Sequence, residues 1–248
     1  MKAMIFAAGL GTRLKPITDT IPKALLPIGG KTLLQHQLER LRDAGFQEIV
    51  INIHHFPEQI IRFCHEHDNF GLNILFSDET ELLLETGGGL KKAKELLLPT
   101  DEPILVCNVD ILSNIDIPSL VSAHKEDALA TIVVSERQTQ RYFLFNEKNH
   151  LCGWTNIATG EVRPASLAAE PAEKVLAYRK LAFSGMQIVS PRIFNVMASW
   201  PEKFSITNFY LDVLPSERID AFVPQNYRMM DIGKIDHLHE AELFAESL

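Results

Sequence analysis

A short glycine-rich segment near the N-terminus has the composition of a phosphate-binding loop. Gly9 and Gly11 follow an apolar run, and two cations, Arg13 and Lys23, come after them. Glycines let backbone N–H groups approach phosphate oxygens closely, and the cations would neutralise phosphate charge. The segment has no P-loop spacing, and Leu14 stands where a dinucleotide-binding loop needs its third glycine. We therefore expect a phosphate cradle that belongs to neither of these two common types.

A second glycine-rich segment and an aspartate are further candidates for ligand binding. Glu85 precedes the glycine triplet 87–89, which would give a planar group close access to the backbone. A glycine triplet alone is more often a flexible turn. Asp110 comes just after the apolar run 103–107. Since open α/β sheets place ligand-binding residues at the carboxyl ends of their strands, Asp110 is a candidate metal ligand.

The elements that must position these residues follow from the hydrophobic pattern. Apolar runs predict strands at 2–8, 48–53, 72–76, 103–107, 130–134, 180–183 and 186–189. Amphipathic segments predict helices at 33–44, 58–67, 89–97, 117–126, 206–214 and from about 234. This alternation is typical of a three-layer α/β fold in which helices flank a mixed, mainly parallel sheet.

The length and composition suit one domain that contains residues 1–248. A hydrophobic content of 46% is enough for a buried core of ordinary size. From about 136 to 180 the alternation becomes irregular and hairpin-like, which we interpret as an insertion or lid. No run approaches the roughly 20 apolar residues that span a bilayer.

The charge and the cysteine content restrict the partners and the compartment. A net charge of −8 disfavours binding to nucleic acid or to an anionic membrane, so an anionic substrate needs a local basic site. The three cysteines show neither metal-ligand spacing nor a disulfide framework. A reducing cytoplasm is therefore expected. The oligomeric state is left open.

The two glycine-rich segments form part of a longer composite pattern. Residues 9–14 read GLGTRL, residues 22–27 read PKALLP and residues 84–89 read LETGGG. The first two together resemble the signature of the sugar nucleotidyltransferase family, the NDP-sugar pyrophosphorylases. The third is similar to members of the mannose-1-phosphate guanylyltransferase and N-acetylmuramate-1-phosphate uridylyltransferase type. The family fold implied is a nucleotide-diphospho-sugar transferase fold, which is Rossmann-like.

The resemblance implies a role for each matching position. Arg13 would contact the triphosphate and steady the departing pyrophosphate, and Lys23 would bridge the substrate phosphates. Residues 230–233, MDIG, are similar to the family segment whose aspartate is a second metal ligand. Asp110 and Asp231 would thus hold Mg²⁺, which prefers carboxylate, phosphate and water oxygens. The implied nucleotide-binding residues are Ala8, Gly9, Gly11, Thr12, Glu85, Gly87 and Gly88.

The region that would bind the sugar phosphate matches the family less well. Lys174 and Gly185 loosely fit positions at which a lysine touches the sugar phosphate and a glycine lies against the sugar. Arg179 and Lys180 remain alternatives to Lys174. The insertion at about 136–180 would act as the lid and as part of the sugar site.

The expected activity is Mg²⁺-dependent transfer between a nucleoside triphosphate and a sugar 1-phosphate, giving an NDP-sugar and pyrophosphate. A hexose-type sugar such as mannose 1-phosphate or N-acetylmuramic acid 1-phosphate is expected, and the sequence does not decide the base, the sugar or the pathway. Two alternatives remain. One is a cytidylyltransferase for an alcohol phosphate such as phosphocholine, which would need an aromatic cage. The other is a catalytically silent nucleotide-sugar sensor.

Overall fold

The computed structural model describes residues 1–248, and it confirms the predicted α/β class with a mixed, mostly parallel sheet. The main sheet has ten strands, eight of them in the order β11-β10-β9-β12-β6-β1-β4-β5. Parallel pairing joins four of these, β1 (Lys2–Phe6), β4 (Glu48–Ile53), β5 (Asn73–Asp78) and β6 (Ile104–Asn108). Their carboxyl ends therefore meet at one edge.

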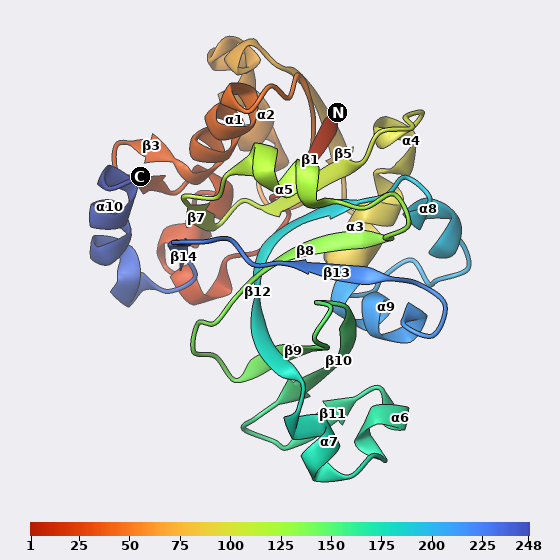
Figure 1. Cartoon of the computed structure of the whole chain (residues 1–248). Helices are drawn as coiled ribbons and strands as arrows, with labels where there is room; N and C mark the ends of the chain where they lie inside the picture. The colour runs from red at the N-terminus through yellow and green to blue at the C-terminus, as the bar shows by residue number, and fades with distance from the viewer.

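Helices cover both faces of this sheet and give it three layers (Figure 1). Strand β4 shows why: Ile49 and Ile51 belong to one buried cluster and Val50 to the other, as expected when successive side chains point to opposite faces. The helices on the first side include α1 (Leu33–Asp43), α2 (Pro57–Glu66) and α10 (Leu238–Glu246). Those on the second include α3 (Glu85–Lys92), α4 (Lys94–Leu97), α8 (Ile193–Val196) and α9 (Ile206–Val213).

The irregular stretch consists of the antiparallel strands at one end of the main sheet and two short helices, and it lies at the bottom of the view in Figure 1. It contains β9 (Arg141–Phe145), β10 (Leu151–Asn156), β11 (Glu161–Arg163), α6 (Ala165–Ala168) and α7 (Ala172–Leu176). Strand β12 (Arg179–Val189) connects the two parts, because its first residues pair with β9 and its last residues with β6. The two strands predicted at 180–189 are therefore one continuous strand.

Several shorter elements complete the fold. They are β2 (Pro27–Ile28), β3 (Lys31–Thr32), β7 (Ile111–Ser113), α5 (Ile117–Ala123), β8 (Ala130–Ser135), β13 (Ile219–Phe222) and β14 (Met229–Asp231). Strand β14 pairs antiparallel with β7 and brings the late part of the chain back to the end of β6. None of the helices combines the length and the hydropathy that a membrane-spanning helix requires.

Candidate active site

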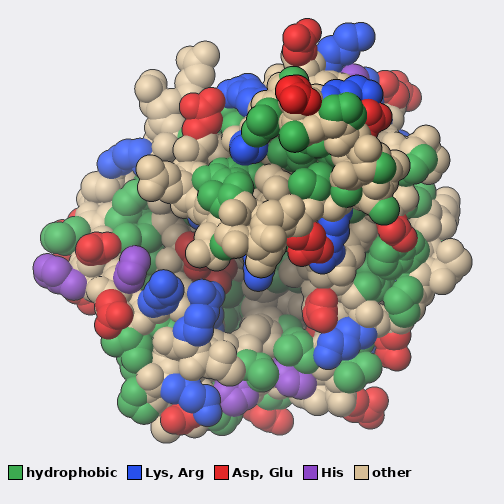
Figure 2. All heavy atoms as spheres, turned by 90° about the horizontal axis from the view of Figure 1, so that it is seen from below, with side chains coloured by type: hydrophobic (Ala, Val, Ile, Leu, Met, Phe, Trp, Pro, Cys, Tyr) green, Lys and Arg blue, Asp and Glu red, His purple; other side chains and the backbone are tan.

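A cavity of about 340 Å³ lies where the parallel strands β1 and β6 end. The face of the molecule seen from below is hollowed near its middle, with basic and acidic side chains around the hollow (Figure 2). The predicted site residues that line the cavity come from four separate stretches of chain. They are Ala8, Gly9, Gly11, Thr12, Arg13, Lys23, Glu85 and Asp110.

The first glycine-rich loop owes its shape to a glycine and a threonine. Gly11 has a φ of +62°, and a Cβ atom there would lie 2.8 Å from the Thr18 methyl group. The Gly11 carbonyl oxygen accepts hydrogen bonds from the Leu14 N–H at 2.8 Å and from the Thr18 hydroxyl at 2.9 Å. This tight turn makes the chain reverse direction, so that the residues after Gly11 line the cavity rather than extend the strand.

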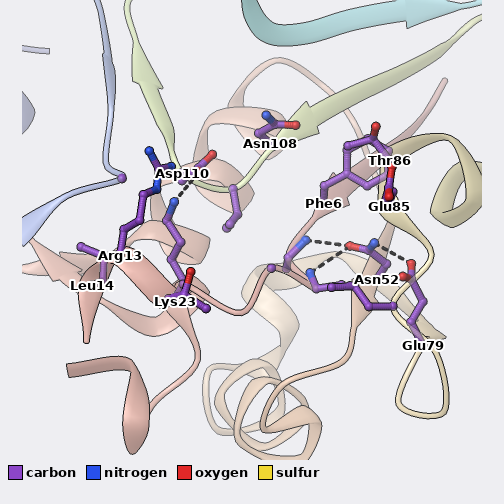
Figure 3. Close-up of a pocket in the computed structure, with 18 residues that line it drawn as sticks. Phe6, Arg13, Leu14, Lys23, Asn52, Glu79, Glu85, Thr86, Asn108 and Asp110 are labelled. Atoms are coloured by element: carbon purple, nitrogen blue, oxygen red, sulfur yellow. Dashed lines mark hydrogen bonds and ion pairs between the residues drawn. The ribbon is translucent and has the colours of Figure 1, made fainter. Parts of the chain in front are cut away.

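The two predicted cations lie at the same end of the cavity as Asp110. Lys23 is buried, and its ammonium group forms an ion pair with the Asp110 carboxylate. Arg13 is exposed and points toward the same place (Figure 3). A buried lysine keeps its charge best beside a carboxylate, so Asp110 holds Lys23 in position for an anionic ligand.

Asp231 lies next to Asp110, although 120 residues separate them in the sequence. Antiparallel pairing of β7 with β14 sets Asp231 opposite Ile111, and the Ile232 N–H donates to the Asp110 carbonyl oxygen at 2.9 Å. Gln37 on α1 fixes the same turn, because its amide donates to the Ile111 carbonyl oxygen at 2.7 Å. Backbone pairing thus brings the Asp231 segment next to Asp110, close enough for the Asp110 carboxylate to act on that of Asp231.

The environment of Asp231 favours a cation. The residue is exposed and is not among those that line the cavity, but desolvation of its carboxyl group and the nearby Asp110 carboxylate raise its pKa, while Lys23, Arg13 and Arg137 oppose the rise. Two adjacent carboxylates repel each other, and a divalent cation between them would remove that repulsion. Gly233 lines the cavity nearby, and a Cβ atom there would lie 2.9 Å from the Arg13 guanidinium.

A buried polar network, which the sequence did not reveal, connects the two glycine-rich segments. The Asn52 side-chain oxygen accepts from the Ala7 and Ala8 N–H groups at 2.7 and 3.3 Å, and its NH₂ group donates to Glu79 at 2.7 Å (Figure 3). The other Glu79 oxygen accepts from the Leu84 N–H at 3.1 Å, at the N-terminus of α3. Asn52 is 3% exposed and Glu79 is 0% exposed.

The glycine triplet differs from the predicted loop. Helix α3 begins at Glu85 rather than at 89, so the triplet is helical and buried. The N–H groups of Gly87 and Gly88 donate to the Phe204 carbonyl oxygen at 2.9 and 3.1 Å, and a Cβ atom at Gly87 would lie 2.3 Å from the Phe204 ring. These two predicted nucleotide-binding glycines do not line the cavity. They face the segment before α9 instead and let α3 pack closely against it. Glu85 and Thr86 line the cavity instead.

Gly185 lies in an adjoining pocket of about 190 Å³. This pocket shares Phe6, Thr86 and Asn108 with the first cavity. Gly185 has a φ of +72°, and a Cβ atom there would lie 2.8 Å from Ile111 and 3.0 Å from the Asn108 amide. A side chain at this position would therefore clash with its surroundings, and the prediction that Gly185 lies against the sugar stays a prediction.

Lys174 lines none of these cavities. It is exposed on α7 and forms a 2.9 Å ion pair with Glu170, and this ion pair raises its pKa. Of its two alternatives, Arg179 pairs with Glu136 at 2.9 Å, and Lys180 lines a separate hollow beside α6 and α7. The expectation for Lys174 rested on a loose match to the sequence pattern, and this lysine lies on α7 and does not line the pocket that contains Gly185.

Comparison with families and known proteins identifies relatives over almost the whole chain. The model of the nucleotidyl transferase family matches residues 2–247. A UTP–glucose-1-phosphate uridylyltransferase from Synechocystis is 30% identical over 253 residues, which cover 97% of this chain and 62% of that protein. An N-acetylmuramate alpha-1-phosphate uridylyltransferase from Neisseria meningitidis is 44% identical over 134 residues, 50% of this chain and 57% of that protein. The chain thus spans about three fifths or less of the length of these relatives.

Solved structures share the fold along their full length. HddC from Yersinia pseudotuberculosis has a TM-score of 0.74 at 25% identity, over 98% of this chain and 99% of that chain. A putative glucose-1-phosphate thymidylyltransferase from Bacillus anthracis has a TM-score of 0.80 at 17% identity, over 100% of this chain and 96% of that chain. The three-layer architecture is therefore one that nucleotidyltransferases use.

Proposed function

Because the chain belongs to the nucleotidyl transferase family, we propose that it joins a nucleoside triphosphate to a sugar 1-phosphate and releases pyrophosphate. The observation that carries the proposal is the meeting of Arg13, Lys23 and Asp110 at one end of one cavity, with Asp231 of β14 close to Asp110. The relatives named for uridylyl transfer to glucose 1-phosphate and to N-acetylmuramate 1-phosphate support the same reaction class.

The proposed reaction needs no general base. A phosphate oxygen of the sugar 1-phosphate is already an anion at neutral pH, and it attacks the α-phosphorus of the triphosphate in line. The new bond forms between that oxygen and the α-phosphorus, and the bond to the bridging oxygen of the β-phosphate breaks. Pyrophosphate leaves with the electron pair. Catalysis therefore depends on positioning and on neutralising charge, which are tasks that Arg13 and Lys23 can perform.

Each cation has a distinct part in the proposal. Lys23 is buried and fixed by Asp110, so its ammonium group can stabilise charge at the α-phosphorus with little loss of conformational freedom. Arg13 is exposed beside Gly233, and its planar guanidinium can bind two oxygens of the leaving pyrophosphate at once. The N–H groups of the Gly9–Thr12 loop would contact the same phosphates.

The carboxylate pair fits a Mg²⁺ ion. Asp110 and Asp231 offer hard oxygen donors at one end of the cavity, and no group of three or more potential ligand side chains lies together in the chain. Mg²⁺ takes its remaining ligands from substrate phosphates and water, so two carboxylates suffice. When bound, the ion would supply charge neutralisation at the triphosphate and bring the two substrates into register. The base would lie at the other end, near Glu85 and Thr86.

A screen of substrates tests the proposal directly. ATP, CTP, GTP, UTP and dTTP are each incubated with Mg²⁺ and a panel of sugar 1-phosphates, with phosphocholine as a further acceptor. We expect pyrophosphate release that depends on a sugar 1-phosphate, and an NDP-sugar of the matching mass. Turnover with phosphocholine alone would favour the cytidylyltransferase alternative. Tight nucleotide-sugar binding without any pyrophosphate would favour a sensor and contradict the proposal.

A further inference from the structure

A third cavity continues the row beyond Gly185. It has a volume of about 500 Å³ and shares Phe183 and Thr207 with the Gly185 pocket. Since that pocket shares residues with the proposed nucleotide cavity, the three cavities adjoin one another in a row. The cavity lies between the antiparallel strands β9–β11 and the start of α9. Its charged lining residues are Arg137, Arg141, Arg163 and Glu161.

The strand register explains why the basic side chains face the same space. Arg141 on β9 pairs with Asn156 on β10, and Trp154 on β10 pairs with Arg163 on β11. Directly opposed residues share a face of the sheet, and residues two apart on one strand do as well. One face of this small sheet therefore carries Arg141, Trp154, Asn156 and Arg163 into the cavity. The strand register itself, and not the flexibility of long side chains, therefore brings these residues to the same cavity.

The charge in this cavity is unbalanced. Glu161 forms a 2.6 Å ion pair with Arg163, whose guanidinium also stacks 5.1 Å from the Trp154 ring. Arg137 donates to the Phe183 carbonyl oxygen at 3.1 Å and has no carboxylate partner. Arg141 likewise has no carboxylate partner. Two uncompensated cations thus lie in one cavity of a chain whose net charge is −8.

The two free arginines differ in their distance from the proposed chemistry. Arg137 donates to the carbonyl oxygen of Phe183, which also lines the Gly185 pocket, so it lies toward the proposed chemistry and suits the phosphate of a sugar 1-phosphate. Arg141 lies on β9 opposite Asn156, lines only the third cavity and is available at the sugar end. An occupied Trp154 face and an excess of cations also disfavour a quaternary ammonium group.

We propose that this cavity selects sugar 1-phosphates that carry a second anionic group, which Arg141 binds. The inference rests on the proposed function, because it assigns the end of the row next to Gly185 to the sugar. A neutral sugar would leave Arg141 without a partner, whereas a carboxylate or phosphate on the sugar or its substituent would pair with it. Asn156 and Asn208 line the same cavity and could hydrogen-bond the sugar hydroxyls.

Matched substrate pairs test the inference. Each pair differs by one anionic group: glucose 1-phosphate with glucuronic acid 1-phosphate, N-acetylglucosamine 1-phosphate with N-acetylmuramic acid 1-phosphate, and glucose 1-phosphate with glucose 1,6-bisphosphate. We expect at least one acidic member to have a kcat/KM about tenfold or more above that of its neutral counterpart, as a charge-assisted contact provides. The first two pairs report a carboxylate, and the third reports a phosphate.

The variant Arg141→Gln separates the sugar end from the chemistry. It should remove most of the preference for the acidic member and leave kcat/KM for the neutral member within about twofold. Arg62→Gln is the matched control, since Arg62 is an exposed arginine on α2 outside all three cavities. Thermal unfolding of both variants shows whether the fold is intact.

The outcomes distinguish the inference from the reaction on which it rests. If acidic and neutral members react equally well, or if Arg141→Gln lowers both alike, the inference is wrong and the proposed function stands. If no sugar 1-phosphate gives pyrophosphate with any nucleotide, the proposed function fails and the inference fails with it.

Discussion

The two ends of the row of cavities are built differently. At the proposed triphosphate end, Asn52 and Glu79 are buried and hydrogen-bonded to the backbone of two glycine-rich segments, and the buried Lys23 forms an ion pair with Asp110. At the other end, Arg137 and Arg141 are exposed residues around short antiparallel strands. Buried polar networks fix one geometry, whereas exposed side chains can be exchanged at little cost to the core. We infer that the first end serves chemistry common to all triphosphates and the second serves selectivity.

The largest expected effect is on the carboxylate pair. Asp231→Asn should lower kcat about 100- to 1,000-fold, because it removes one hard ligand from the proposed Mg²⁺ site. The variant should fold normally, since Asp231 is exposed on a short edge ladder. Steady-state pyrophosphate release measures the loss. Asp212→Asn, at an exposed position on α9, is the control that should keep full activity.

Asp231→Asn should also be slightly more stable than the parent protein when EDTA is present. The raised pKa of Asp231 means that folding disfavours its charged form, so at neutral pH the ionised carboxylate reduces the free energy of unfolding. Asparagine removes that penalty. As the pH falls through the raised pKa, the parent becomes protonated and the difference disappears. Thermal unfolding at several pH values measures this difference in stability. If the nearby cations mainly stabilised the carboxylate, Asp231→Asn would instead be less stable than the parent at neutral pH.

Lys23→Met should have the next largest effect on turnover. We expect kcat to fall about 100-fold, because the substitution removes the charge proposed to act at the α-phosphorus and leaves Asp110 without its partner. Single-turnover rates under saturating nucleotide measure the chemical step. Lys31→Met is the control, because Lys31 is exposed and pairs with Glu39 away from the cavity. An unchanged rate for Lys23→Met would contradict the proposal that Lys23 stabilises charge at the α-phosphorus.

Glu79→Gln tests whether the buried network positions the nucleotide. Glutamine has the same shape, but its NH₂ group must face either the Asn52 amide or the Leu84 N–H, which are both donors. We expect the free energy of unfolding to fall by about 1–3 kcal/mol and KM for the nucleotide to rise. Urea denaturation and initial rates measure the two effects. Glu58→Gln on the exposed side of α2 is the control.

Gly185→Ala tests the border between the two ends. The alanine methyl group would meet Ile111 and the Asn108 amide in a left-handed backbone conformation, so stability should fall by about 1–2 kcal/mol. We expect KM to rise for the sugar 1-phosphate and to stay constant for the nucleotide. A rise in KM for the nucleotide alone would show that Gly185 belongs to the nucleotide site and not to the sugar site.

The smallest effect is expected at Lys174. Since this lysine is exposed and pairs with Glu170 outside the row of cavities, Lys174→Ala should change KM for the sugar 1-phosphate by less than about twofold. Initial rates over a range of sugar 1-phosphate concentrations check this. A large rise in KM would show that α7 closes over the sugar during turnover and that the lysine acts there.

The triphosphate end was easier to predict because its residues lie in continuous segments. The spacing of Gly9, Gly11 and Arg13 is visible in one loop, and the parallel strands around it have simple apolar patterns. Asn52 and Glu79 were missed because they act through contacts between strands, although a polar residue inside the apolar run 49–53 was a usable signal. The partners at the sugar end meet through the register of three short hairpin strands, which local patterns do not encode.

The central claim is that Asp110 and Asp231 act as one centre, and a double-mutant cycle on pyrophosphate release tests it most directly. Asp110→Asn and Asp231→Asn are made singly and together, and rates are measured in saturating Mg²⁺ and substrates. If the two carboxylates hold one ion, the double variant should be no slower than the worse single variant, within about threefold. Losses that multiply, or a single variant that keeps near-parental turnover, would contradict the account.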